Sequence, residues 1–290
     1  MPRLLILDFD GTLTDAEQEG LPYKEGYLED VALLANVDLT VATQWANEIE
    51  STIQQNPGSY GWRFKGQIVA PAIVDPYLRM MPIARGILDR AGAFSNDAER
   101  ERILDRILYK YNYTKTHTVF RPGACQFFET LREHELSEKP IYTVVVTNSH
   151  TVPVQEKIAL LGEQNGVDFS WLIERIVGSA QKYILDNTAS HLPESMEIPN
   201  LERPIYLQRA HYANILNSIQ ETYGCSWAQT TVLGDIFELD LSLPLHLGAT
   251  VGLMQNPFSP VYEIEFLESH ERGSVHSDLN AALNWIIQLD

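Results

Sequence analysis

Residues 4–12 read Leu4-Leu5-Ile6-Leu7-Asp8-Phe9-Asp10-Gly11-Thr12, a short apolar run that stops at a glycine and a threonine. An apolar run of this length bounded by a turn predicts a buried β-strand, here residues 4–9. Two acids, Asp8 and Asp10, stand where that strand ends. Because ligands of open α/β sheets bind beyond the carboxyl ends of the strands, this turn is the first candidate for a functional site.

Three more apolar runs predict strands that also end in polar residues. They cover residues 141–147, 230–233 and 249–253. Patterns typical of helices lie between them, at residues 122–131, 154–161 and 211–223. Alternating strands and helices indicate an α/β fold built on a parallel sheet flanked by helices.

Residues 15–118 break this alternation. They contain long helical patterns and a middle segment punctuated by Gly and Pro, residues 57–76. The helical patterns cover residues 28–50, 83–91 and 98–111. We therefore predict two domains: a core formed by residues 1–14 and 119–290, and a mainly α-helical insertion formed by residues 15–118.

The composition is that of a folded, strongly acidic protein. Of the 290 residues, 44% are hydrophobic and 21% are charged, which is enough apolar surface for a sizeable core. The 39 acidic residues outnumber the 21 Lys and Arg residues, for a formal net charge of −18. This charge repels nucleic acids and anionic membranes at long range, so we expect neither as a partner.

The cysteines and the first residues indicate the cellular location. Cys125 and Cys225 are too few for a disulfide framework or a four-thiolate metal site. The apolar run that begins at Leu4 is too short for a signal-peptide core or a membrane anchor. We expect a cytoplasmic protein.

Acidic side chains gather at the predicted strand ends. Asp8 and Asp10 can reach the same side of the sheet edge, where Gly11 permits the backbone to turn away. The strand at residues 230–233 leads to Asp235 and Asp240. Like charges placed so close together are costly unless a cation neutralises them. Because carboxylate oxygens favour Mg²⁺ over Zn²⁺, the sequence predicts a magnesium site.

Three motifs in this order resemble those of the haloacid dehalogenase (HAD) superfamily. They are Asp8-x-Asp10-Gly11-Thr12 after the first strand, an apolar strand that ends in Thr147-Asn148, and Gly234-Asp235 followed by Asp240. The resemblance covers the predicted core. It implies a Rossmann-like domain, and it identifies residues 15–118 as a helical cap inserted between the first and second motifs.

The resemblance implies roles for the residues that match the motifs. Asp8 would be the nucleophile that attacks phosphorus, and Asp10 would be the general acid and then the general base. Gly11, Thr147 and Asn148 would belong to the phosphate-binding part of the site. A covalent carboxylate intermediate is chemically reasonable, because it divides a difficult displacement into two easier steps.

The resemblance also implies how Mg²⁺ is held. Asp8, Asp235 and the main-chain carbonyl of Asp10 would bind the ion, with Asp240 as a supporting carboxylate. The ion matters because a carboxylate cannot easily approach an anionic phosphate without one.

The family further requires a Lys or Arg that pairs with the nucleophile and the phosphoryl group, and three residues compete for this role. Arg209 follows an apolar stretch and lies 26 residues before Asp235, the spacing that we expect. Lys182 follows a strand-like run but lies 53 residues before Asp235. Arg203 is the third candidate. We favour Arg209, whose fork of donors suits a phosphate, and keep Lys182 and Arg203 as alternatives.

The insertion predicts the size of the substrate. By resemblance it closes over the site as a lid, which excludes water and supplies specificity contacts. Arg63 and Lys65 are its candidate substrate-binding cations, in a segment that also carries aromatic residues. A large closing lid favours a small phosphorylated metabolite over a phosphoprotein.

The predicted function is therefore a HAD-like, Mg²⁺-dependent phosphatase, a phosphoric monoester hydrolase acting through an aspartyl-phosphate intermediate. The alternatives are a phosphomutase or phosphotransferase with the same nucleophile, and a catalytically weak protein that binds a phosphorylated ligand. Asp10 disfavours a dehalogenase or a phosphonatase, because those family members lack an acid at that place. The sequence leaves the substrate, the pathway and the oligomeric state open.

Overall fold

The computed structural model describes residues 2–94, 96–111, 117–186, 188 and 192–289. The chain divides into two compact units. The core unit comprises Met1–Asp15, Phe64–Ala70 and Phe120–Asp290, and the helical unit comprises Ala16–Arg63 and Pro71–Val119. Residues 64–70, which lie inside the predicted insertion, thus pack with the core unit.

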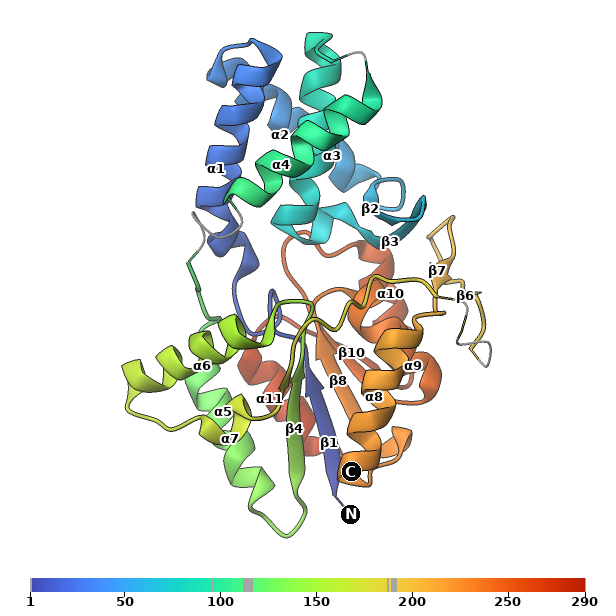
Figure 1. The fold of residues 1–290 in the computed structure, drawn as a ribbon. Helices are drawn as coiled ribbons and strands as arrows, with labels where there is room; N and C mark the ends of the chain where they lie inside the picture. The colour runs from blue at the N-terminus through green and yellow to red at the C-terminus, as the bar shows by residue number, and fades with distance from the viewer. Residues whose placement is uncertain (1, 95, 112–116, 187, 189–191, 290) are drawn as a thin grey trace. The chain divides into compact units, whose positions relative to one another are not determined.

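A six-stranded parallel sheet forms the centre of the core unit (Figure 1). Its strand order is β10-β9-β8-β1-β4-β5. The strands are β1 (Arg3–Leu7), β4 (Ile141–Val146), β5 (Ile176–Val177), β8 (Thr230–Gly234), β9 (Thr250–Met254) and β10 (Gly273–His276). The predicted parallel α/β fold is confirmed, and β1 lies between β4 and β8 inside the sheet.

Helices cover both faces of this sheet (Figure 1). Successive side chains of a strand point to opposite faces, so Leu4 and Ile6 enter one apolar cluster while Leu5 and Leu7 enter the other. The first cluster includes side chains of α8 (Ala210–Tyr223), α9 (Ser242–Leu247) and α10 (Val261–Ser269). The second includes side chains of α5 (Ala124–Glu135), α6 (Thr151–Asn165), α7 (Ser170–Ile173) and α11 (Leu279–Gln288). The double cover explains why these strands are apolar throughout rather than alternating.

Smaller elements complete the core unit. A two-stranded antiparallel sheet pairs β6 (Ser195–Met196) with β7 (Ile205–Tyr206). A 3₁₀ turn, η2 (Trp227–Gln229), precedes β8, and a single π-helical turn, η3 (Phe237–Leu241), follows it. Helical turns of the π type often mark functional sites.

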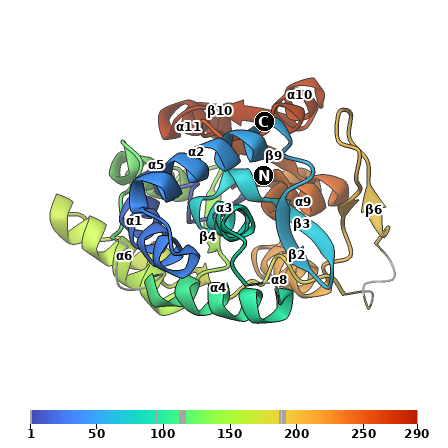
Figure 2. The same ribbon diagram turned by 90° about the horizontal axis from the view of Figure 1, so that it is seen from above.

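The helical unit contains α1 (Ala16–Ala35), α2 (Leu39–Gln55), α3 (Pro76–Ala91) and α4 (Asp97–Tyr111). Figure 2 shows α3 nearly end-on among the other three helices, with which it packs. A hairpin of β2 (Gly61–Phe64) and β3 (Gln67–Pro71) and a 3₁₀ turn, η1 (Ala72–Val74), form the segment between α2 and α3.

The predicted continuous helix over residues 28–50 is wrong, because α1 ends at Ala35 and a separate helix, α2, begins at Leu39. Asn36 adopts a left-handed conformation with φ of 53° just past the end of α1. Asp38 then caps α2, and its carboxylate accepts a hydrogen bond from the Thr40 amide at 2.8 Å. Asn past a helix end and Asp at an N-cap are recognised stop and start signals, but the apolar periodicity runs across them.

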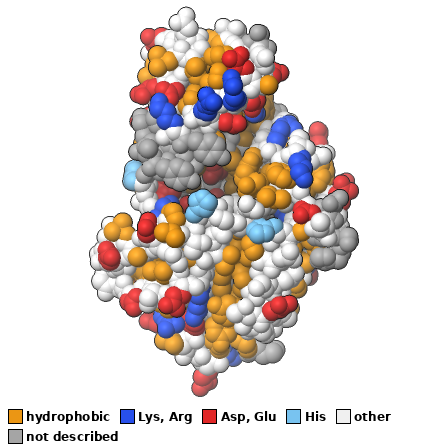
Figure 3. Space-filling view, viewed as in Figure 1, with side chains coloured by type: hydrophobic (Ala, Val, Ile, Leu, Met, Phe, Trp, Pro, Cys, Tyr) orange, Lys and Arg blue, Asp and Glu red, His pale blue; other side chains and the backbone are white. Residues whose placement is uncertain are grey.

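On the face seen in Figure 3, acidic and basic side chains are interspersed with apolar ones. None of the described helices is both long enough and apolar enough to cross a membrane.

Candidate active site

The carboxyl ends of β4, β1 and β8 place the motif residues at one edge of the sheet. Leu7 pairs with Val145 on one side and with Leu233 on the other, so the three strands end nearly level. Asp8 follows β1 directly, and its amide donates to the Leu233 carbonyl at 2.9 Å. The sheet therefore brings together side chains that are far apart in the sequence.

Lys182 places its ammonium between two acids of this edge. Its Nζ lies 2.7 Å from Oδ1 of Asp8 and 2.8 Å from Oδ1 of Asp240, and the side chain is only 1% exposed. Lys182 belongs to the loop that follows β5, residues 178–186, which we call the lysine loop. The Lys182 amide donates to Oδ1 of Asn148 at 2.8 Å, which ties this loop to the end of β4. The lysine thus bridges the first and last motifs.

The contact predicted for Arg209 is not observed. Arg209 is fully buried, and its guanidinium donates to main-chain carbonyls of Tyr206, Val69 and Lys182. Arg203 forms a two-pronged ion pair with Glu238, at 2.6 and 2.8 Å. The prediction favoured Arg209 because of its spacing to Asp235. It failed because β5, the strand before Lys182, has only two residues, and because a long segment with its own hairpin separates β5 from α8.

Three carboxylates form a cluster around the lysine. Ligand oxygens of Asp8, Asp235 and Asp240 all lie within 4.8 Å of one another, and all three residues are buried. The Thr12 hydroxyl donates to Oδ2 of Asp8 at 3.1 Å. With Lys182 the cluster carries a formal charge of −2, and its donors are all hard oxygens. A divalent ion such as Mg²⁺ fits this set in both charge and chemistry.

Glycines make room for these acids. Gly11 has a φ of 79°, and a Cβ added to it would lie 2.1 Å from Oδ2 of Asp235. A Cβ on Gly234 would lie 2.4 Å from the Cβ of Asp240. Each motif glycine therefore allows a carboxylate of the cluster to pack against the main chain.

Gly11→Ala is expected to weaken Mg²⁺ binding, because the new methyl group must displace the Asp235 carboxylate. The left-handed backbone adds a strain of about 1–2 kcal/mol. Isothermal titration of the variant with Mg²⁺ measures the first effect. Gly166→Ala is the matched control, since Gly166 has a φ of 71° and no atom within 4 Å of its added Cβ. Equal Mg²⁺ affinity in both variants would contradict a cation site beside Gly11.

Burial raises the pKa of the Asp8 carboxyl from 3.8 to about 7, although the ammonium of Lys182 acts in the opposite direction. The charge of Asp240 adds to the rise. Because the folded state then holds this proton more tightly than the unfolded state, the metal-free protein loses stability as pH rises from about 4 to about 7.

Mg²⁺ is therefore expected to raise the melting temperature more at pH 8 than at pH 5. At pH 8 Asp8 is ionised and the ion relieves its repulsion, whereas at pH 5 a proton already does so. Thermal melts with and without Mg²⁺ at the two pH values measure this difference. The difference should shrink in Asp8→Asn, and an equal stabilisation at both pH values in the unmodified chain argues against a role for Asp8 in binding the ion.

Asp10 is not one of the three clustered carboxylates, although its charge acts on Asp8. Its Oδ2 accepts a hydrogen bond from the Ser149 hydroxyl at 2.6 Å, and its Oδ1 lies 3.5 Å from Nζ of Lys157. Its side chain is 34% exposed, so it is reachable from solvent. The motifs did not single out Ser149 or Lys157. Ser149 stands next to a motif residue, but Lys157 is found only when α6 is placed against the turn after β1.

The two phosphate-binding candidates that follow β4, Thr147 and Asn148, are held by neighbours. Thr147 is buried, and its hydroxyl accepts the Ser149 amide at 3.1 Å. The side-chain oxygen of Asn148 is taken by the Lys182 amide. Asn148 thus orients the lysine loop in this structure.

The two cations predicted in the insertion fall in different units. Arg63 belongs to the helical unit and Lys65 to the core unit. Lys65 stands at the β2–β3 turn with a φ of 49° and lines a hollow of about 430 Å³. The lining of this hollow also includes Gln67, Asp186 and Tyr206, and none of the clustered carboxylates.

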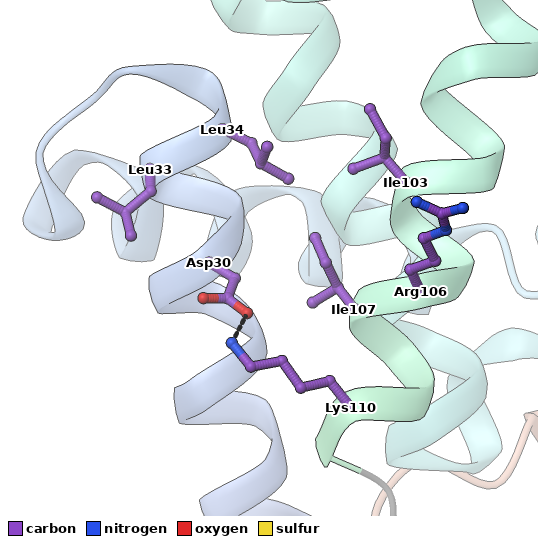
Figure 4. A pocket seen from close by; sticks show the side chains of 7 residues that line it. All are labelled: Asp30, Leu33, Leu34, Ile103, Arg106, Ile107 and Lys110. Carbon is purple, nitrogen blue, oxygen red and sulfur yellow. Dashed lines mark hydrogen bonds and ion pairs between the residues drawn. The ribbon is translucent and has the colours of Figure 1, made fainter.

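A second hollow, of about 440 Å³, lies between α1 and α4 in the helical unit (Figure 4). Apolar side chains of both helices line it, and an ion pair of Lys110 with Asp30 at 2.9 Å stands at its side. It contains none of the candidate residues.

The comparisons with known proteins concern structure. No protein-family model matches the chain, and no curated protein matches its sequence. A predicted phosphoglycolate phosphatase from Haemophilus somnus is similar over 99% of this chain and 98% of its own, with 16% identity and a TM-score of 0.52.

Two further solved structures match with lower scores. One is a HAD-hydrolase from Bacillus subtilis bound to magnesium, with 16% identity, 99% of each chain covered and a TM-score of 0.49. The other is a haloacid dehalogenase-like family hydrolase from Xanthomonas campestris, with 14% identity, 100% of this chain and 92% of that chain covered, and a TM-score of 0.46. At sequence identities this low, structural similarity shows only that two proteins share a fold. The parallel sheet, its helical cover and the match to the Haemophilus somnus protein over nearly the whole chain show that this protein has the fold of the haloacid dehalogenase-like hydrolases.

Proposed function

We propose that this protein is a Mg²⁺-dependent phosphatase that hydrolyses a small-molecule phosphate monoester. The observation that carries the proposal is the contact of Lys182 with both Asp8 and Asp240, beside Asp235. A buried carboxylate paired with an ammonium and close to two further carboxylates suits a nucleophile that must meet an anionic substrate.

In the first step, a carboxylate oxygen of Asp8 attacks phosphorus and the bond to the ester oxygen breaks. Asp10, in its acid form, gives its proton to the departing alcohol. In the second step, Asp10 takes a proton from a water molecule, whose oxygen attacks the phosphorus of the aspartyl phosphate. Inorganic phosphate leaves, and Asp8 returns to its carboxylate form.

Several side chains prepare these steps. Ser149 and Lys157 hold Asp10 by its two oxygens, which fixes the direction of proton transfer. Lys182 orients Asp8 and offers its charge to the phosphoryl oxygens. Asp8, Asp235 and Asp240 would hold Mg²⁺, which when bound supplies positive charge to the transferring phosphoryl group.

The test is turnover of p-nitrophenyl phosphate with Mg²⁺ and with EDTA, followed by a panel of phosphorylated metabolites. We expect hydrolysis that depends on Mg²⁺ and releases inorganic phosphate in equal amount to the alcohol. Transfer of phosphate to an added sugar with no free phosphate would instead support a phosphotransferase. Binding of phosphorylated ligands without turnover would support the weak binding protein, and halide release from 2-haloacids would support a dehalogenase.

A further inference from the structure

Arg209 is an unusual buried arginine because its hydrogen bonds go to main-chain carbonyls. Its Nε donates to the carbonyl of Tyr206 at 3.0 Å, one terminal nitrogen donates to that of Val69 at 3.0 Å, and the other to that of Lys182. The side chain is 0% exposed. A buried charge is costly unless its donors are bonded and opposite charges lie near, and these three contacts lower that cost together with the charges of Glu238 and Asp240.

These contacts hold three segments together at one point. The carbonyls belong to β3, to the loop that carries Lys182, and to β7. Two side-chain contacts lie beside them. The Tyr206 hydroxyl of β7 donates to Oε1 of Gln67 in β3 at 2.5 Å, and the ring of Phe64, the last residue of β2, lies 6.0 Å from that of Tyr183 in the lysine loop. Residues 64–70 therefore contact both the lysine loop, through Tyr183, and β7, through Tyr206.

The main chain of Lys182 is held at both of its polar groups. Its amide donates to Asn148, and its carbonyl accepts from Arg209. A lysine side chain has four rotatable bonds and loses about 2 kcal/mol of rotamer entropy when it is fixed in one position. Anchoring the main chain on both sides restricts where the ammonium can go, and this favours the position between Asp8 and Asp240.

We propose that Arg209 is a positioning residue that holds Lys182 against Asp8 and ties the lysine loop to residues 64–70. The inference rests on the proposed function, because it assigns a purpose to the position of Lys182. Residues 64–70 come from the stretch between the first and second motifs, so Arg209 links that stretch to the reacting carboxylate.

The test is a double-mutant cycle of Arg209→Met and Lys182→Met, with kcat and KM measured on p-nitrophenyl phosphate. We expect Arg209→Met to lower kcat by roughly 10- to 100-fold and to change KM less than about threefold, because the lost contact acts in the transition state. The double variant should be no slower than Lys182→Met alone, since both changes remove the same contact. Additive losses would overturn the proposal.

A control separates positioning from loss of stability. Arg175→Met removes a core-unit arginine whose ion pair with Glu135, at 2.8 Å, lies at the opposite end of β5. We expect it to lower the melting temperature while kcat of the folded protein stays unchanged. If Arg209→Met does not fold, Arg209→Lys enters the same cycle, because it keeps the charge and loses the three-way fork of donors.

A crystal structure of the Arg209 variant decides the matter without activity. We expect the distance from Nζ of Lys182 to Oδ1 of Asp8 to exceed hydrogen-bonding range, and retention of the 2.7 Å contact would overturn the proposal. If the unmodified chain hydrolyses no phosphate ester, the proposed function fails while this structural comparison still decides the role of Arg209.

Discussion

Asp8→Asn is expected to reduce turnover of p-nitrophenyl phosphate by on the order of 10⁴-fold or more, because a neutral amide cannot attack phosphorus and no covalent intermediate forms. The fold should survive the change. Burial and the charge of Asp240 both disfavour the ionised carboxylate of Asp8, so its removal relieves a cost. In metal-free protein at pH 8 we expect the melting temperature to stay level or rise.

The two readouts make this variant informative. A loss of activity with an unchanged or higher melting temperature is the signature of a functional residue held at the expense of stability. Asp105→Asn, which neutralises an exposed aspartate on α4, is the control and should leave both quantities unchanged. Full activity in Asp8→Asn would remove Asp8 from the mechanism even if the chain proved to be a phosphatase.

Lys182→Met is expected to lower kcat by roughly 10²- to 10³-fold, the loss that follows removal of one electrostatic contact to a developing charge. It should also lower stability, since Asp8 and Asp240 lose the ammonium that lies 2.7 and 2.8 Å from them. The loss of stability should be larger without Mg²⁺ than with it, because the ion would replace part of the missing charge. Stopped assays and thermal melts measure the two effects.

Lys139→Met is the control for this second change, because Lys139 is exposed and follows the last turn of α5. We expect kcat and the melting temperature of this control to match those of the unmodified chain. If Lys182→Met kept kcat within about threefold, the lysine would be a structural counter-ion for the buried acids and would have no part in phosphoryl transfer.

Strand positions were predictable from the sequence, because a strand covered on both faces must be apolar throughout. Residues 4–9, 141–147, 230–233 and 249–253 all show this pattern and all coincide with strands of the parallel sheet. β5 was predicted only as a strand-like run before Lys182, and β10 was not predicted. These strands have two and four residues, which is too short for the apolar pattern to be recognised. The break between α1 and α2 was missed because buried positions continue on both sides of Asn36 and Asp38.

The motif acids could also be placed from the sequence, since each follows a predicted strand and the carboxyl ends of parallel strands share one edge. The residues that contact these acids could not be placed from the sequence. Ser149, Lys157 and Lys182 reach Asp8 or Asp10 from loops and a helix whose positions depend on packing. Arg209 has the expected spacing from Asp235, but it contacts main-chain carbonyls instead of Asp8. Spacing in the sequence does not show in which direction a buried side chain points.

The sequence by itself determined the parallel sheet, the residues at its edge and the presence of acids there, because apolar runs and turn residues act locally. The tertiary structure alone decided which cation meets Asp8. That choice depends on how a two-residue strand, a hairpin and residues 64–70 pack together, and packing brings in contacts between residues more than a hundred positions apart. Long-range contacts of this kind determine which charged side chains are buried next to each other, and a local sequence pattern does not show them.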